Sequence, residues 1–350
     1  MIRSVPLRAL AALATFSLSA CSTISYYAHL AHGEASLLAA RRPIERLVAD
    51  PSTDPHLRAR LDLARQARAF ASDRLGLPRN GSYTDYADLH RPYAVWNVFA
   101  APEFSLDPVQ HCFLLVGCVA YRGYYDRADA DAEAACLRAQ GNDTWVGGVS
   151  AYSTLGWFDD PILNTMLRWD DDELVGTIFH ELAHQRVYVK GDTEFNESFA
   201  TFVQREGLRE WHAARGLPPV DASRERQSEE FDALVLAARE RLRQLYAQPL
   251  ASDVLRARKR EEIERLRSDY RELRATKWHG DATYDGWIES EINNAKLLPF
   301  GLYNRLVSAF ERLFDDRGKD WGVFYGAVGE LGRMTQARRA ERLGRLQSGL

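Results

Sequence analysis

The pattern H-E-x-x-H occupies residues 180–184. On a helix, residues four apart lie one turn apart on the same face, so His180 and His184 can bind one Zn²⁺, each at about 2.0–2.1 Å. Glu181 points to the same side and can hold a metal-activated water without ligating the metal, as a general base must. The residue types and their spacing therefore predict a zinc-dependent hydrolase with Glu181 as its catalytic base.

The flanking residues predict a half-buried helix from Asp170 onward. Leu174, Ile178 and Leu182 recur every four residues and form an apolar face. The helix start, residues 170–173, is entirely acidic, and the helix dipole favours acids there. The alternative is a surface helix with a solvated histidine pair. The apolar face argues against it.

A catalytic zinc site needs a third protein ligand and an open fourth position. The Gly-Asp pair at 191–192 predicts a tight turn, followed by a second helix that contains Glu197. If the turn reverses the chain, Glu197 faces the histidines, although it lies thirteen residues after His184. Glu194 and Glu206 are alternative third ligands.

Two resemblances extend this interpretation. The H-E-x-x-H motif followed by Glu197 in an N-E-x-x-A context resembles the gluzincin metallopeptidases, with a shorter linker than in many of them. The mature chain also resembles the putative aminopeptidase family of proteobacterial lipoproteins, a zincin-like group. The matching stretches are residues 83–105, 118–124, 147–160, 180–207 and 293–295, with Tyr303. The resemblance implies a zinc-dependent peptidase with one Zn²⁺ per chain, assigned as an aminopeptidase.

Further residue roles follow from what zincins share. They bind extended substrate along an edge strand beside the active-site helix, which implicates the predicted strand at 144–155 and Tyr152 within it. Gluzincins also stabilise the oxyanion with a downstream tyrosine or histidine. Tyr303 is the first choice for this role, with Tyr284 or His279 as the second.

Recognition of a free α-amine needs an acid near the zinc, and the predicted edge strand contains no glutamate. The anchors that remain are Asp159, Asp160, Glu289 and Glu291. None of them stands out, so a metalloendopeptidase remains the alternative. Asn293 and Asn294 either bind the substrate backbone or cap local structure.

The N-terminus predicts an export signal. Residues 1–20 have a short basic start followed by an apolar run at 9–19. Leu-Ser-Ala-Cys at 18–21 resembles the lipobox of bacterial lipoproteins, which implies a lipid anchor on Cys21. Ser22 implies outer-membrane sorting in a Gram-negative cell, facing the periplasm. The alternative is ordinary secretion with Cys21 as a free thiol.

Composition and charge exclude other classes of protein. The 350 residues are 46% hydrophobic and 27% charged, as in ordinary globular proteins, so a mostly disordered chain is excluded. The net charge of −4 becomes −6 once Arg3 and Arg8 leave with the signal peptide, so no nucleic-acid partner is expected. The longest apolar run is too short to span a bilayer, which excludes a multi-pass membrane protein.

The elements that position the site predict an α+β, zincin-like protein. It should be predominantly helical, with a small mixed sheet beside the motif helix. β-Branched and aromatic runs predict strands at 93–99, 113–121 and 144–155. Residues 21–350 are predicted to form a single domain.

Within this domain, residues 222–276 predict a long helical hairpin arm, split near Pro249. The arm packs on the core or, in the alternative of a non-catalytic envelope lipoprotein, binds a protein partner.

The chain's four cysteines are too few for a disulfide scaffold. Cys112 and Cys118 lie in one strand-like segment and are the predicted disulfide pair, closing a small loop. Cys136 is left over and could compete for either partner.

Overall fold

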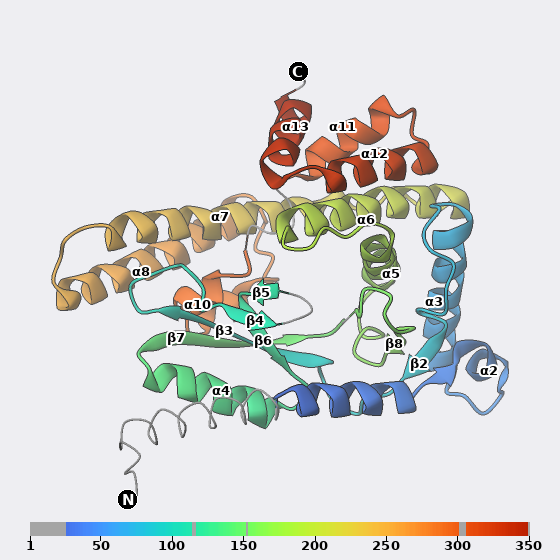
Figure 1. Ribbon diagram of the computed structural model, residues 1–350, viewed down its shortest axis with the longest axis horizontal. Helices are drawn as coiled ribbons and strands as arrows, with labels where there is room; N and C mark the ends of the chain where they lie inside the picture. The colour runs from blue at the N-terminus through green and yellow to red at the C-terminus, as the bar shows by residue number, and fades with distance from the viewer. Residues whose placement is uncertain (1–25, 114–116, 152, 301–305, 349–350) are drawn as a thin grey trace, which may run out of the picture.

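A computed structural model describes residues 26–113, 117–151, 153–300 and 306–348 (Figure 1). The chain is mostly helical with small sheets, which confirms the predicted α+β class. Cys21, the signal peptide, Tyr152 and Tyr303 lie outside the described residues. Within the described ranges, every helix is too short or too polar to cross a bilayer.

Besides the helical residues 26–39, the helices are α2 (Ile44–Ala49), α3 (Pro55–Asp73), α4 (Arg127–Ala139), α5 (Asp171–Arg186), α6 (Thr193–Arg215), α7 (Ala222–Tyr246), α8 (Ser252–Thr276), α9 (Asp285–Glu289), α10 (Asn294–Leu297), α11 (Val307–Asp316), α12 (Trp321–Arg333) and α13 (Gln336–Ser348). The strands are β1 (Arg42–Pro43), β2 (Asp85–Ala87), β3 (Val95–Pro102), β4 (His111–Phe113), β5 (Gly117–Val119), β6 (Tyr121–Tyr124), β7 (Asn142–Val149) and β8 (Ile162–Leu163).

The strands of the described residues form three small sheets rather than one mixed sheet. In the first, β2 pairs antiparallel with β1 and parallel with β8. In the second, β3 lies between β6 and β7, antiparallel to both. The third is the hairpin of β4 and β5. The mixed character is therefore confined to the first sheet.

Two strand predictions need correction. The segment predicted as one strand at 113–121 is a hairpin followed by β6, because Cys112 faces Cys118 across the hairpin and a disulfide joins them. The strand predicted to reach residue 155 ends at Val149. Beyond it, Ser150 O accepts a hydrogen bond from Thr165, and the buried Asp160 carboxylate accepts one from Thr154 N at 2.9 Å. These bonds turn the chain away from β3.

Strand β3 buries both of its faces. Val98 and Ala100 pack against α4 and the helix at 26–39, while Phe99 and Ala101 pack against α10. This is the alternation of side chains that a strand imposes. In Figure 1 the β6–β3–β7 sheet accordingly lies between α4 on one side and α10 with the α7–α8 hairpin on the other.

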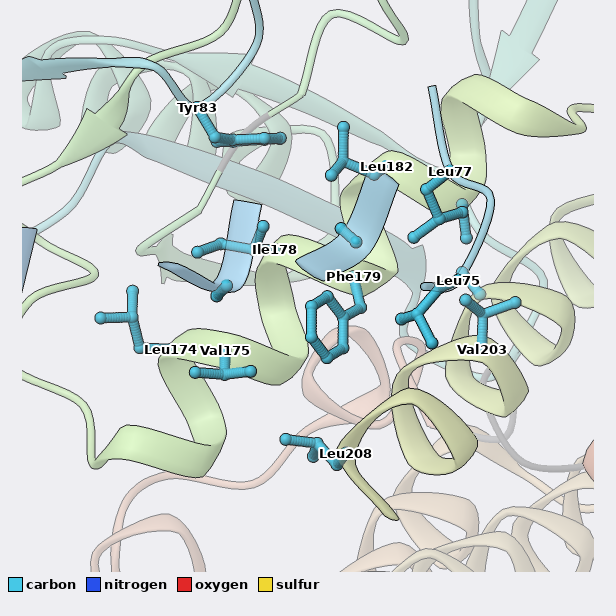
Figure 2. Packing of buried hydrophobic residues seen from close by; sticks show 14 of the residues in the cluster. Leu75, Leu77, Tyr83, Leu174, Val175, Ile178, Phe179, Leu182, Val203 and Leu208 are labelled. Atoms are coloured by element: carbon cyan, nitrogen blue, oxygen red, sulfur yellow. The ribbon is translucent and has the colours of Figure 1, made fainter. Parts of the chain in front are cut away.

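Helix α5 forms as predicted. The Asp170 carboxylate caps it by accepting a hydrogen bond from Glu173 N at 2.8 Å. Leu174, Ile178 and Leu182 are fully buried in the main core, where α5 packs against α3 and α6 (Figure 2).

Glycines allow α5 and α6 to approach closely. A Cβ at Gly207 on α6 would lie 2.8 Å from the Phe179 ring on α5, and one at Gly176 would lie 3.0 Å from Leu208. Side chains at these positions would force the helices apart. On its other side α6 packs against α11, so it lies between α5 and the C-terminal helices (Figure 1).

Helices α7 and α8 form the predicted arm, separated by a connection that contains Pro249. Their apolar side chains form one cluster with residues of α9 and α10: Phe231, Val235, Ala238, Leu242, Leu245, Leu255, Leu266, Tyr270, Ile288 and Leu297. Lys259 of α8 bonds the Asp143 carboxylate at 2.6 Å and Glu103 O at 2.9 Å. The arm therefore packs on the rest of the chain.

Candidate metal centre

The turn between α5 and α6 is held by one buried side chain. Asn196 accepts a hydrogen bond from Val189 N and donates one to Val189 O, both at 2.8 Å. Gly191 takes a left-handed conformation in this turn, with φ of +80°. Asp192 caps α6 by accepting from Phe195 N at 3.2 Å. The chain thus reverses within a few residues and brings α6 back along α5.

The C-terminal helix stabilises the same turn. Arg339 of α13 is buried, and its Nε donates to Asp192 Oδ2 at 2.9 Å. Its guanidinium also lies 5.2 Å from the centre of the Phe195 ring. A charged hydrogen bond of this kind is worth more than a neutral one when both groups are largely desolvated. Arg339 therefore anchors the start of α6, which sequence reasoning did not predict.

The reversal places three ligand atoms together. His180 Nε2 lies 3.3 Å from Glu197 Oε2, His184 Nε2 lies 3.6 Å from Glu197 Oε2, and the two Nε2 atoms are 3.2 Å apart. Ligands about 2.0–2.1 Å from one tetrahedral ion are separated by about 3.3–3.4 Å. The three separations match this spacing closely.

The hydrogen bonding of His180 sets the direction of its lone pair. Its Nδ1 lies 3.1 Å from Gln204 Oε1, and a carboxamide oxygen only accepts hydrogen bonds. Nδ1 therefore carries a proton, so a neutral His180 ring has its lone pair on Nε2, the atom that faces Glu197 and would bind a metal. Metal-binding histidines commonly have such an outer partner.

The charges at this centre are strongly coupled. Burial raises the pKa of Glu197, but hydrogen bonds from His180 and His184 outweigh it and lower this pKa to about 2. Burial lowers the pKa of His180, while the hydrogen bond to Glu197 and the charges of Glu181 and Glu197 leave it raised overall. These directions favour an ionised Glu197 carboxylate paired with His180.

The donor set fits zinc. Two imidazoles and a carboxylate are the protein ligands of many catalytic zinc sites, which keep a fourth position open. Among the described residues, His180, His184 and Glu197 are the one group of three or more His, Cys, Asp or Glu side chains whose ligand atoms converge, within 4.8 Å. Their side chains are only 12%, 7% and 20% exposed. Glu194 and Glu206 do not belong to this group, and Glu206 instead pairs with Arg209.

Glu181 is half-buried and lies outside the ligand cluster. Its charge nevertheless acts on His180 and on Tyr83. It is therefore an acid beside the centre and outside the ligand cluster, and its role as a base stays a prediction.

Two tyrosines near the centre were not predicted. The Tyr188 ring centre lies 6.4 Å from that of His184, and the ring is 50% exposed. Tyr121, on β6, is 40% exposed. Burial raises the pKa of both phenols, and the charge of Glu197 raises both further. Tyr188 could have been found from its position four residues after His184, whereas Tyr121 is distant in the sequence.

The structure gives the two asparagines structural contacts. Asn294 is fully buried; its Nδ2 donates to three main-chain oxygens and its Oδ1 accepts from Tyr246 Oη at 2.8 Å. Asn293 caps α10 by accepting from Lys296 N. Of the two predicted roles, these contacts favour local structure over substrate binding.

The other predicted residues lie in various surroundings. Tyr284 stacks on Phe231 within the arm cluster, with ring centres 4.0 Å apart. His279, Glu289 and Glu291 are exposed. Burial raises the pKa of Asp160 to about 6, although hydrogen bonds from Thr154 oppose this. None of these residues belongs to the ligand cluster.

The contact from Gln204 yields a test. Gln204→Leu removes the acceptor for His180 Nδ1, so we expect zinc affinity to fall by about 10- to 100-fold. Competition between the metal-stripped protein and a zinc-binding dye measures this. Gln244→Leu, at an exposed position on α7, is the matched control and should bind zinc like wild type. Equal affinity in Gln204→Leu would show that this contact does not orient the ligand.

Comparison with known proteins gives one match. A family model described as a putative aminopeptidase covers residues 25–343. The matched segment contains the ligand cluster, Glu181 and both unpredicted tyrosines, and it begins after the predicted signal peptide. A search of the curated proteins and a search of the solved structures found no match.

Proposed function

Because the chain belongs to the putative aminopeptidase family, we propose that it is a zinc-dependent peptidase of gluzincin type with a zincin-like fold, acting as an aminopeptidase. The observation that carries this proposal is the convergence of His180, His184 and Glu197. Their ligand atoms lie at the distances from one another that are expected around a tetrahedral ion. Family membership suggests peptide substrates, and the ligand geometry supports zinc as the cofactor.

The residues around the centre have complementary roles in this proposal. A zinc ion held by His180, His184 and Glu197 would supply a Lewis acid that activates a water and polarises the carbonyl under attack. Glu181 takes the proton of the attacking water and passes it to the leaving amine. The carbonyl oxygen becomes negative and needs a hydrogen-bond donor. Tyr188 and Tyr121, whose phenols stay protonated beside Glu197, join Tyr303 as candidates for that donor.

The segment after β7 supports the proposed substrate site. A Cβ at Gly156 would lie 3.5 Å from the side chain of Gln185, the residue that follows His184. This segment therefore runs beside the motif helix. It also carries Trp157, 75% exposed, and Phe158, which offer apolar surface to a peptide side chain. We propose that an extended peptide binds along this side of α5.

We also propose that the mature protein is anchored in the outer membrane through a lipid on Cys21 and faces the periplasm. The lipobox-like sequence at 18–21 supports this. The alternative of a non-catalytic lipoprotein would use the helical arm to bind a partner. The peptidase is preferred because the arm already buries its apolar face within the chain.

A substrate panel tests the function. The purified mature protein, loaded with zinc, is assayed with aminoacyl fluorophores and with internally quenched peptides, each with a free or an acetylated N-terminus. An aminopeptidase cleaves the substrates with free amines and leaves the acetylated ones intact. Equal cleavage of acetylated peptides would instead show an endopeptidase. No cleavage in any arm would favour the non-catalytic alternative.

A further inference from the structure

Tyr83 has an unusual backbone for a bulky residue. Its φ is +63°, in the left-handed region that favours glycine. A contact with a distant part of the chain stabilises this conformation, because Tyr83 N donates a hydrogen bond to Asp160 O at 2.6 Å. Such strain persists where the surrounding structure imposes it, and it is common at functional sites.

The Tyr83 side chain has a second anomaly. It is 1% exposed, yet its Oη has no hydrogen-bond partner of acceptable geometry among the described residues. Buried tyrosine hydroxyls normally find a partner. Tyr325, which is also buried, does so, because its Oη donates to Leu75 O at 2.8 Å. One residue thus combines a strained backbone with an unsatisfied hydroxyl.

Tyr83, with its strained backbone and unsatisfied hydroxyl, lies beside α5, the helix that carries the H-E-x-x-H motif. Its ring packs in the core with Ile178 and Leu182 of α5 (Figure 2). Two residues that precede Tyr83 in the chain hydrogen-bond to Gln185. Asn80 Nδ2 donates to Gln185 Oε1 at 2.7 Å, and Gln185 Nε2 donates to Ser82 Oγ at 3.2 Å. Gln185 lies one turn after Glu181 on the same face of α5. These contacts hold Tyr83 beside the turn that carries the proposed base.

Electrostatics supports this placement. Burial is the main cause that raises the pKa of Tyr83, and the charge of Glu181 comes next, ahead of that of Asp160. The nearby Ser153 hydroxyl lowers this pKa but does not outweigh them, and its geometry falls short of a good hydrogen bond to Tyr83 Oη. The phenol therefore keeps its proton and can only donate to a nearby carboxylate.

We propose that Tyr83 is a positioning residue for Glu181, donating its hydroxyl hydrogen to the Glu181 carboxylate when that side chain closes on the attacking water. The inference rests on the proposed function, since Glu181 is the base of that reaction. Hydrogen bonds of this kind are often open in a free enzyme and tighten in the substrate complex. The fold would then retain an unsatisfied hydroxyl because it is used only during turnover.

Tyr83→Phe tests this, because it keeps the ring and removes only the hydroxyl. We expect kcat to fall by about 10- to 100-fold, the range for outer partners of a site, with KM and zinc affinity unchanged. The melting temperature should stay the same or rise, since a buried unpaired polar group is removed. Tyr325→Phe is the matched control; it should lower the melting temperature and leave kcat unchanged.

The outcomes separate this inference from the proposed function. A wild-type protein that cleaves no peptide would overturn both. If wild type is active and Tyr83→Phe retains its kcat, only the inference fails. A fall of kcat together with lower zinc affinity and a lower melting temperature would assign Tyr83 a purely structural role, and would also overturn it.

Discussion

The Glu181→Gln variant is expected to bind zinc as tightly as wild type and to lose about 10²- to 10⁴-fold in kcat. Glutamine keeps the size of the side chain but cannot take a proton from water. The affinity should survive because Glu181 lies outside the cluster of His180, His184 and Glu197. Zinc titration and peptide hydrolysis on the same preparation measure the two quantities.

The matched control is Glu173→Gln, an acid at the start of the same helix and away from the ligand cluster. It should keep both zinc and activity. A Glu181→Gln variant that hydrolyses peptides at the wild-type rate would refute the assigned base. One that loses zinc would show instead that Glu181 is a ligand.

The second large effect is expected from Glu197→Gln. This change replaces an anionic ligand with a neutral amide between two buried histidines. Loss of a residue that hydrogen-bonds a metal ligand typically lowers metal affinity by about 10- to 100-fold. Glu197→Gln should lower zinc affinity by more than this, because Glu197 is itself a proposed ligand. Peptide hydrolysis should then disappear at zinc concentrations that saturate wild type.

Controls for this variant come from the two alternative third ligands. Glu194→Gln and Glu206→Gln should both bind zinc like wild type, because neither side chain joins the cluster. If one of them loses zinc while Glu197→Gln keeps it, the third ligand has been misassigned. A dye-competition titration of all three variants decides this.

Local features made much of the site predictable. The i, i+4 spacing of His180 and His184 defines a pair on any helix, and the acidic start with its apolar face predicted α5. Glu197 was predicted from a tight turn and from the N-E-x-x-A context that resembles gluzincins. The buried Asn196 clamp on Val189 gives the physical reason that this turn is tight.

Tertiary contacts explain what sequence reasoning missed. Arg339 reaches Asp192 across 147 positions, and no local pattern indicates that pair. The pairing of β6 with β3 places Tyr121 near enough to Glu197 for the Glu197 charge to raise its pKa. The hairpin of β4 and β5 was predicted as part of a single strand. A short apolar run is consistent with either arrangement, so the sequence pattern could not distinguish them.

The same limit applies to Asn294. Its type and position suggested substrate binding or capping, and only the surrounding chain distinguishes the two. Tyr83 is a further example, since nothing in the sequence marks a tyrosine with a left-handed backbone. A side chain whose role depends on contacts with residues distant in the sequence can be identified only once the fold is known.

We propose that one zinc ion, held by His180, His184 and Glu197, makes this chain a peptidase. The most direct measurement follows hydrolysis of a peptide by the metal-stripped wild-type protein as zinc is added back. We expect the stripped protein to be inactive and the activity to rise linearly to a plateau at one zinc per chain. Activity that persists in the stripped protein, or zinc that binds without producing any activity, would contradict it.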